Sequence, residues 1–158
     1  GDVDVKDAGE VLANCEAIKQ AEKTERTSIL DGVPKDLPSL MAAYKLQHKA
    51  AKVGFDWPDI DPVWDKLEEE LRELEEAIVD GQKEKIEEEL GDVLFTIVNI
   101  SRFLKIDPEV ALTGKNRKFR RRFSYIEKKV KAKQQNWESL SLIDLDELWQ
   151  EDKLQDKK

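Results

Sequence analysis

The sequence is poor in the residues on which many catalytic and metal centres depend. Its 158 residues include one cysteine, one histidine and one methionine, and no glycine-rich phosphate loop. The single Cys15 excludes an intramolecular disulfide and fits a reducing compartment, so we expect a cytoplasmic protein. We expect His48 to be an exposed helix residue. With no Ser/His/Asp set and no second cysteine, the sequence offers no route to covalent catalysis.

Long apolar runs and excess positive charge are also absent. No apolar segment is long enough to span a membrane, and no signal peptide is visible, so no membrane partner is expected. The net charge is −8, from 27 basic and 35 acidic residues. This charge argues against general binding to a nucleic-acid polymer, which needs basic contacts to phosphate.

Strand-like alternation is missing throughout, and the apolar residues recur at helical spacing instead, which predicts an all-α helical bundle. We expect one domain over 1–158, with a loose start at 1–6 and a frayed tail at 151–158. Helices are predicted over 8–25, 39–53, 61–79 and 83–104, then from Asp107-Pro108 with a break or bend near Thr113-Gly114. Asp61 is expected to cap the helix over 61–79, with Pro62 in its first turn, and Asp144 to cap a last, short helix. The first residue is Gly1 rather than Met, which suggests a piece of a longer protein.

What the sequence has in abundance is carboxylate, and residues 69–92 arrange it in two pairs. Glu70 and Glu73 lie three residues apart before an Asp-Gly turn, and Glu89 and Asp92 lie three apart after it. Residues three apart share a helix face, and the turn folds the two helices back on each other. Four carboxylates that meet in this way repel unless protons or cations bridge them, and Mg²⁺ is the obvious bridge.

An acidic run is most often a solvated helix face, and charged residues make up 39% of this chain. The second pair favours a metal site over that alternative. Asp92 opens the apolar run 93–100, where an unpaired carboxylate would be costly. Gly91 weakens the helix by about 1 kcal/mol relative to alanine. We interpret it as room for another backbone or a ligand to come close.

A basic stretch with interleaved aromatics follows, and its residues divide by helix face. Phe119 and Phe123 share the stripe of Ile126 and Val130, so we expect them to be mainly core. Lys118 and Arg122 point together, and in so acidic a protein they fit a bound polyanion such as phosphate. The aromatics of the loop 54–60 either stack on a base or sugar, or plug the end of the bundle.

Carboxylate pairs for Mg²⁺ and a basic pair for phosphate predict phosphoryl transfer or phosphate hydrolysis, without saying which phosphorus is attacked. The arrangement Glu69-Glu70-x-x-Glu73, then residues 74–88, then Glu89-x-x-Asp92 resembles the all-α nucleoside triphosphate pyrophosphohydrolases. It is most similar to the MazG family. The similarity extends over almost the whole chain, through the stretches 30–35, 53–57, 87–95, 116–119, 121–123 and 147–149.

The resemblance implies a four-helix core of the MazG type and a homodimer with the site near the subunit interface. It implies a house-cleaning hydrolase that splits NTPs and dNTPs between the α and β phosphates, by attack of a metal-activated water on the α-phosphate. The products are a nucleoside monophosphate and pyrophosphate. The metal is Mg²⁺, with Mn²⁺ as a substitute, and its ligands are Glu70, Glu73, Glu89 and Asp92.

Further residues take their roles from the same resemblance. Glu69 is a supporting acid, Lys118 and Arg122 contact the triphosphate, and Trp149 lines the nucleotide pocket. Lys19 matches another basic position more loosely. Residues 1–6 resemble the join that follows an N-terminal MazG domain, so we expect the C-terminal, catalytic half of a two-domain protein.

Two alternatives remain open from the sequence. The first is a narrower pyrophosphatase specific for dUTP or dCTP. The second is a helical interaction or nucleotide-binding module with a degenerate site, which binds a partner protein or a nucleotide without catalysing its turnover. The presence of all four acids together with both cations favours an enzyme over the second alternative.

Overall fold

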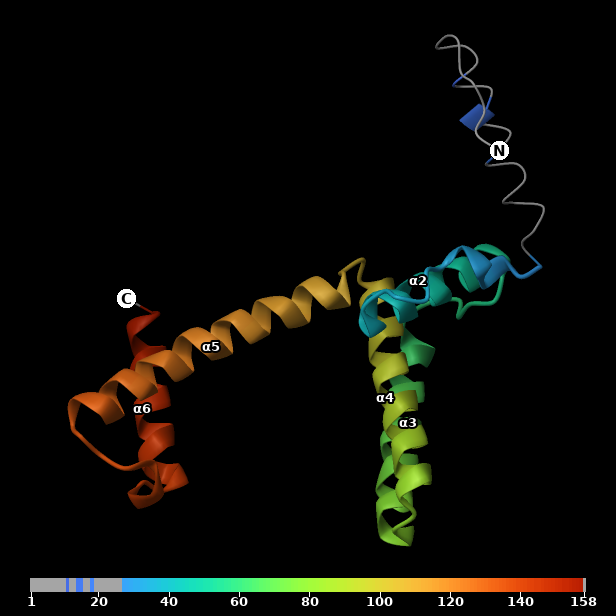
Figure 1. The fold of residues 1–158 in the computed structure, drawn as a ribbon. Coiled ribbons are helices and arrows are strands. Elements are labelled where there is room, and N and C mark those ends of the chain that lie inside the picture. Colours follow the sequence, from blue (N-terminus) through green and yellow to red (C-terminus); the bar gives the residue numbers. More distant parts are fainter. Residues whose placement is uncertain (1–10, 12–13, 16–17, 19–26, 158) are drawn as a thin grey trace. The chain divides into compact units, whose positions relative to one another are not determined.

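The computed structural model describes residues 27–157 together with Val11, Asn14, Cys15 and Ile18, and every regular element in that part is helical (Figure 1). The predicted all-α class is therefore confirmed. Most of the helix expected over 8–25, including Lys19, lies outside the described residues. None of the described helices combines the length and apolar composition that a bilayer crossing needs.

The described elements are five α-helices and two short 3₁₀ helices in two compact units, residues 1–107 and 108–158. The first unit contains η1 (Ile29–Gly32), α2 (Ser39–Lys52), α3 (Asp61–Asp80) and α4 (Lys83–Phe103). The second unit contains α5 (Pro108–Ala132), η2 (Trp137–Ser139) and α6 (Leu142–Gln155).

Helices α3 and α4 run side by side as a hairpin, as the sequence predicts (Figure 1). The turn depends on Gly81, whose φ of 76° lies in the left-handed region that favours glycine. Pro62 occupies the first turn of α3, as expected. The N-cap residue is Ile60 rather than the predicted Asp61. Asp61 is already helical, and the Asp59 carboxylate accepts its N–H at 2.9 Å.

The core of the first unit is small and lies between these helices. It consists of Val63, Ala77, Val93, Val98 and Ile100. Six other apolar residues that the helical stripes place inward are 42–56% exposed in the single chain: Leu71, Ile78, Leu90, Leu94, Ile97 and Leu104. The reason is geometric, since one facing helix covers only part of a stripe as wide as this one.

Two polar contacts attach the remaining segments of the first unit to α4. The buried side chain of Gln47 on α2 donates its Nε2–H to the Phe95 carbonyl at 2.8 Å. Arg102, near the end of α4, donates from both terminal nitrogens to Asp56, and the Asn99 side chain holds the same guanidinium. The loop before α3 is thus tied to the end of α4 that lies far from the turn.

In the second unit, α5 and α6 pack on each other around Ile126 and Val130. The break predicted near Thr113-Gly114 is wrong, because α5 is continuous through it. Helix α6 begins with a capping box in which Ser141, rather than Asp144, is the N-cap residue. It continues through Gln155, so residues 151–155 are helical where the sequence suggests a frayed tail.

Candidate functional site

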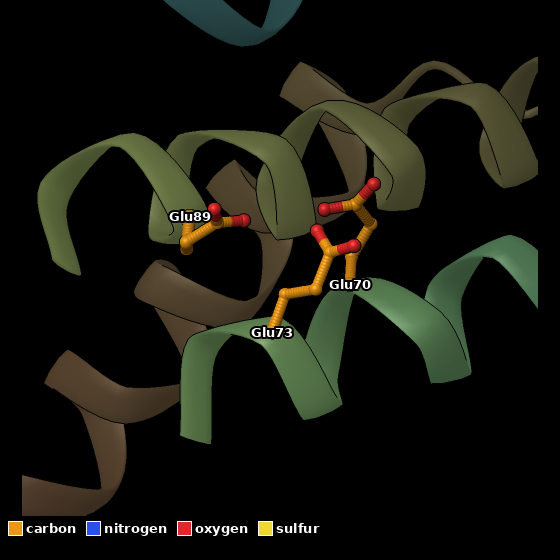
Figure 2. A group of neighbouring side chains, drawn as sticks. All are labelled: Glu70, Glu73 and Glu89. Atoms are coloured by element: carbon orange, nitrogen blue, oxygen red, sulfur yellow. The ribbon is translucent and has the colours of Figure 1, made fainter. Parts of the chain in front are cut away.

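Three glutamates from the two helices of the hairpin converge on one point. Glu70 and Glu73 extend from α3 toward α4, which carries Glu89 (Figure 2). Each offers one carboxylate oxygen, and the three oxygens lie within 4.8 Å of one another. Glu70 and Glu89 are each only 5% exposed. The first predicted acidic pair therefore meets Glu89 of the second pair across the hairpin, and the resulting cluster could hold a metal ion.

The two buried glutamates each have one oxygen in an ion pair and one without a partner. Lys66 Nζ lies 2.9 Å from Glu70 Oε1, and Lys85 Nζ lies 2.9 Å from Glu89 Oε1. The Oε2 atoms of both glutamates are buried and accept no hydrogen bond from the residues that the structure describes. A buried carboxylate oxygen without a partner is costly, so these atoms suit a hard divalent cation.

The pKa values of the cluster reflect this crowding of negative charge. Hydrogen bonding to Glu70 raises the pKa of Glu73, and burial adds to the increase. The hydrogen bond from Lys85 lowers the pKa of Glu89. Bonding to their glutamates in turn raises the pKa values of Lys66 and Lys85. The cluster thus favours bound protons or cations, the behaviour expected of carboxylates that share a site.

The other predicted acids lie at the edge of the cluster. Asp92 is not one of the three residues whose oxygens converge, but burial of its carboxyl group raises its pKa, and the charges of Glu70 and Glu89 contribute. It therefore lies within electrostatic reach of the cluster. Glu69 is half exposed and lies 3.5 Å from Lys66, outside the converging group.

A shallow hollow of about 300 Å³ opens beside the cluster. It is lined by Glu73, Glu76, Ala77, Asp80, Lys85 and Glu89. Its walls are mostly acidic and lie between the cluster and the hairpin turn. A group that enters the hollow reaches the converging carboxylates, and a cation would reduce the repulsion that an anion meets there.

The predicted phosphate-binding residues belong to the second unit, where each has its own surroundings. Lys118 is exposed on α5. Arg122 is largely buried, with Nε 3.3 Å from Asp152 and a terminal nitrogen paired with Asp156. Its guanidinium also lies over the Trp149 ring, 5.2 Å from the centroid. Two of the predicted residues, Arg122 and Trp149, are thus in contact, and the arginine is already neutralised by acids.

The aromatic residues are more exposed than the sequence suggests. Phe119 and Phe123 stack with ring centroids 6.1 Å apart, and Phe119 also contacts Trp149. Phe119 is half exposed, so the prediction that it is mainly core is wrong in the single chain. In the loop before α3, Phe55 is 83% exposed and Trp57 is partly exposed. Neither plugs an end of the first unit.

Sequence reasoning missed the residues that hold the site in place. Lys66 and Lys85 each precede a buried glutamate by four residues, a spacing that would have indicated the ion pairs. No local signal indicates the Asp56–Arg102 pair, whose partners are 46 residues apart. Such pairs depend on tertiary packing.

Comparison with known proteins identifies the family to which this site is related. Residues 62–126 match the MazG nucleotide pyrophosphohydrolase domain, a range that contains all four predicted metal ligands. The chain is 41% identical over 161 residues to the nucleoside triphosphate pyrophosphohydrolase of Escherichia coli, covering 98% of the chain and 60% of that protein. It is 44% identical over 139 residues to the nucleoside triphosphate pyrophosphohydrolase/pyrophosphatase MazG of Thermotoga maritima, covering 87% of the chain and 53% of the relative.

A third relative is the uncharacterised protein YabN of Bacillus subtilis. The identity is 50% over 154 residues, covering 96% of the chain and 32% of the relative. The chain therefore spans 60% or less of the length of each of these three proteins.

Proposed function

Because this chain belongs to the MazG family through its domain at residues 62–126, we propose that it is a nucleoside triphosphate pyrophosphohydrolase. It hydrolyses NTPs and dNTPs between the α and β phosphates and releases a nucleoside monophosphate and pyrophosphate. One observation carries the proposal beyond the family match. The buried Oε2 atoms of Glu70 and Glu89 have no partner among the described residues, and both glutamates converge with Glu73, as a cation site requires.

Mg²⁺ is the cofactor we propose, with Mn²⁺ able to replace it. The donors are all carboxylate oxygens, which hard divalent cations prefer, and the described cluster contains no histidine or cysteine that would favour a softer metal. Glu70, Glu73, Glu89 and Asp92 would hold it. When bound, it would neutralise phosphate charge and make a water molecule more acidic. The buried glutamates fix the position of that charge, since their side chains are held by lysines.

The attacked phosphorus is the α-phosphorus in this proposal, and a water molecule is the nucleophile. The carboxylates would hold the cation that binds the reacting phosphate, and one of them would accept the proton that the water loses, with Glu69 as a supporting acid at the edge. Lys118, Arg122 and Trp149 bind the triphosphate and nucleoside, and Lys19 adds a basic contact. Arg122 is paired with Asp152 and Asp156, so it contacts phosphate only when these ion pairs open.

We also propose that the protein is a homodimer formed through the α3–α4 hairpin. Trp64, Leu71 and Ile78 on α3 are exposed seven residues apart, as are Leu90 and Ile97 on α4 and Leu104 at its C-cap. A heptad repeat on both helices is the pattern by which helices pack lengthwise against a partner. Two hairpins joined along it make a four-helix core. A Cβ added at Gly91 would meet no atom of the described residues within 4 Å, which leaves that spot open to the second copy.

A panel of NTPs and dNTPs, assayed with Mg²⁺ and with EDTA, tests the proposal. Pyrophosphate from several bases and both sugars, lost on chelation, is the expected result. Turnover confined to dUTP or dCTP would replace the broad activity with a narrower pyrophosphatase. Absence of turnover on every substrate would contradict the enzyme and favour a binding module. The chain's place in a longer two-domain protein and in the cytoplasm stay predictions.

A further inference from the structure

The two buried glutamates of the acidic cluster are held in the same way on two different helices. On α3, Lys66 binds Oε1 of Glu70 at 2.9 Å, and on α4, Lys85 binds Oε1 of Glu89 at 2.9 Å. In both glutamates the other oxygen, Oε2, is buried without a partner. Each lysine therefore occupies one oxygen of its glutamate and leaves the other oxygen without a partner, in a carboxylate that belongs to the converging cluster.

Helix stability does not explain these pairs. In an isolated helix, Glu followed by Lys four residues later is the more favourable order, whereas here Lys precedes Glu on both helices. Each lysine also has an exposed acid within reach, Glu69 at 3.5 Å and Glu88 at 3.8 Å. Both ammonium groups nevertheless lie nearer to the buried carboxylate, so the pairs serve the cluster.

We propose that Lys66 and Lys85 are positioning residues for the metal, an inference that rests on the proposed function. Each holds Oε1 of its glutamate and so turns Oε2 inward as a ligand. The lysines also reduce the charge of the site.

Two effects of removing a lysine have opposite signs, and their sizes decide the outcome. Loss of a positive charge favours cation binding, but the side chains of Lys66 and Lys85 are 37% and 50% exposed. Screening by water therefore limits the resulting increase in cation affinity to about fivefold. Loss of a partner that orients a metal ligand weakens binding by about 10–100-fold. The positioning effect therefore dominates, and the variants are expected to bind metal more weakly.

The experiment is a Mn²⁺ titration of the 158-residue chain by calorimetry, with free Mn²⁺ followed by electron paramagnetic resonance. The variants are Lys66→Met and Lys85→Met, which keep the length of the side chain and remove its charge. Arg72→Met on α3 and Lys83→Met on α4 are matched controls, since both remove one exposed positive charge from the same helices. Circular dichroism verifies that each variant retains its helix content.

Dissociation constants that rise about 10–100-fold in the two variants, and change less than about threefold in the controls, are expected. Lys66→Arg, which keeps charge and donors, should recover most of the lost affinity. Affinities equal to those of the controls would overturn the proposal, and tighter binding would overturn it too, because the lysines would then compete with the metal. If either methionine variant does not fold, Lys66→Gln and Lys85→Gln replace it under the same criteria.

Failure of the proposed function would look different from failure of this inference. If the unchanged chain binds no Mn²⁺, both the proposed metal-dependent function and the positioning role of the lysines are refuted. If it binds Mn²⁺ and the lysine variants match their controls, the metal site stands and only the positioning role is lost.

Discussion

Removal of the Asp56 carboxylate should destabilise the first unit by an amount that the structure lets us calculate. Asp56 accepts hydrogen bonds from both terminal nitrogens of Arg102, and the two side chains are 25% and 11% exposed. Hydrogen bonds to charged groups contribute about 1.5–3 kcal/mol, and fully exposed ion pairs less than about 1 kcal/mol. For this largely buried pair we expect Asp56→Asn to lower the free energy of unfolding by about 2 kcal/mol.

Urea denaturation, followed by circular dichroism, measures this change. With a slope of about 2 kcal/mol per molar urea, the midpoint should fall by about 1 M. Asp65→Asn is the control, since Asp65 is exposed on α3 and its replacement should change stability by less than about 0.5 kcal/mol.

The effect should also depend on pH, with a sign that follows from the ion pair. The hydrogen bond from Arg102 lowers the pKa of Asp56 below its usual value of 3.8. A lowered pKa contributes stability that is present above the unfolded pKa and is lost as the pH falls through the folded one. The difference between wild type and Asp56→Asn should therefore be full at about pH 7 and shrink below about pH 4. A difference under about 0.5 kcal/mol at neutral pH, or one that persists undiminished in acid, would refute the reasoning.

Three further changes test other parts of the account. Glu89→Gln should reduce Mg²⁺-dependent turnover by roughly 100-fold or more with helix content unchanged, because it removes a buried ligand. Glu84→Gln, an exposed change on the same helix, should leave the rate intact. Equal rates in the Glu89→Gln and Glu84→Gln variants would show that Glu89 is not part of the site. The metal-free chain should become more stable in urea as the pH falls from neutral toward 4.5, the ordinary value of Glu73, because the raised pKa values of Glu73 and Asp92 give stability that is lost as the pH rises through them. Saturating Mn²⁺ should remove this gain, and a decrease in stability over that range would contradict the assignment. Leu94→Glu should convert the dimer to a monomer in sedimentation, whereas Val79→Glu, at a position 86% exposed on the same hairpin, should not; a chain that is monomeric before any change would overturn the proposed dimer.

The sequence predicts the hairpin and its acidic cluster well because both depend on local rules. Gly81 ends α3 in the left-handed conformation that an Asp-Gly turn indicates. Spacing by three residues places Glu70 and Glu73 on one face, and the turn brings them to Glu89. These inferences need only the helical period and the identity of one turn residue.

Other features could not be predicted because they depend on tertiary contacts. Burial of the wide apolar stripe depends on how many partners cover it, and Leu94 is half exposed with only one hairpin present. Helix α5 continues through Gly114 because a single glycine costs about 1 kcal/mol, which a long helix tolerates. The N-cap residues Ile60 and Ser141 lie one and three residues before the acids that the sequence suggests.

The central claim is that water attacks the α-phosphorus of a nucleoside triphosphate at the acidic cluster. Hydrolysis of ATP or dATP in water enriched in oxygen-18, with Mg²⁺ present, tests it directly by mass spectrometry of both products. The account predicts that the heavy oxygen appears in the nucleoside monophosphate and that pyrophosphate remains unlabelled. Label in pyrophosphate would mean attack at the β-phosphorus, and label in orthophosphate attack at the γ-phosphorus; either result would contradict the account.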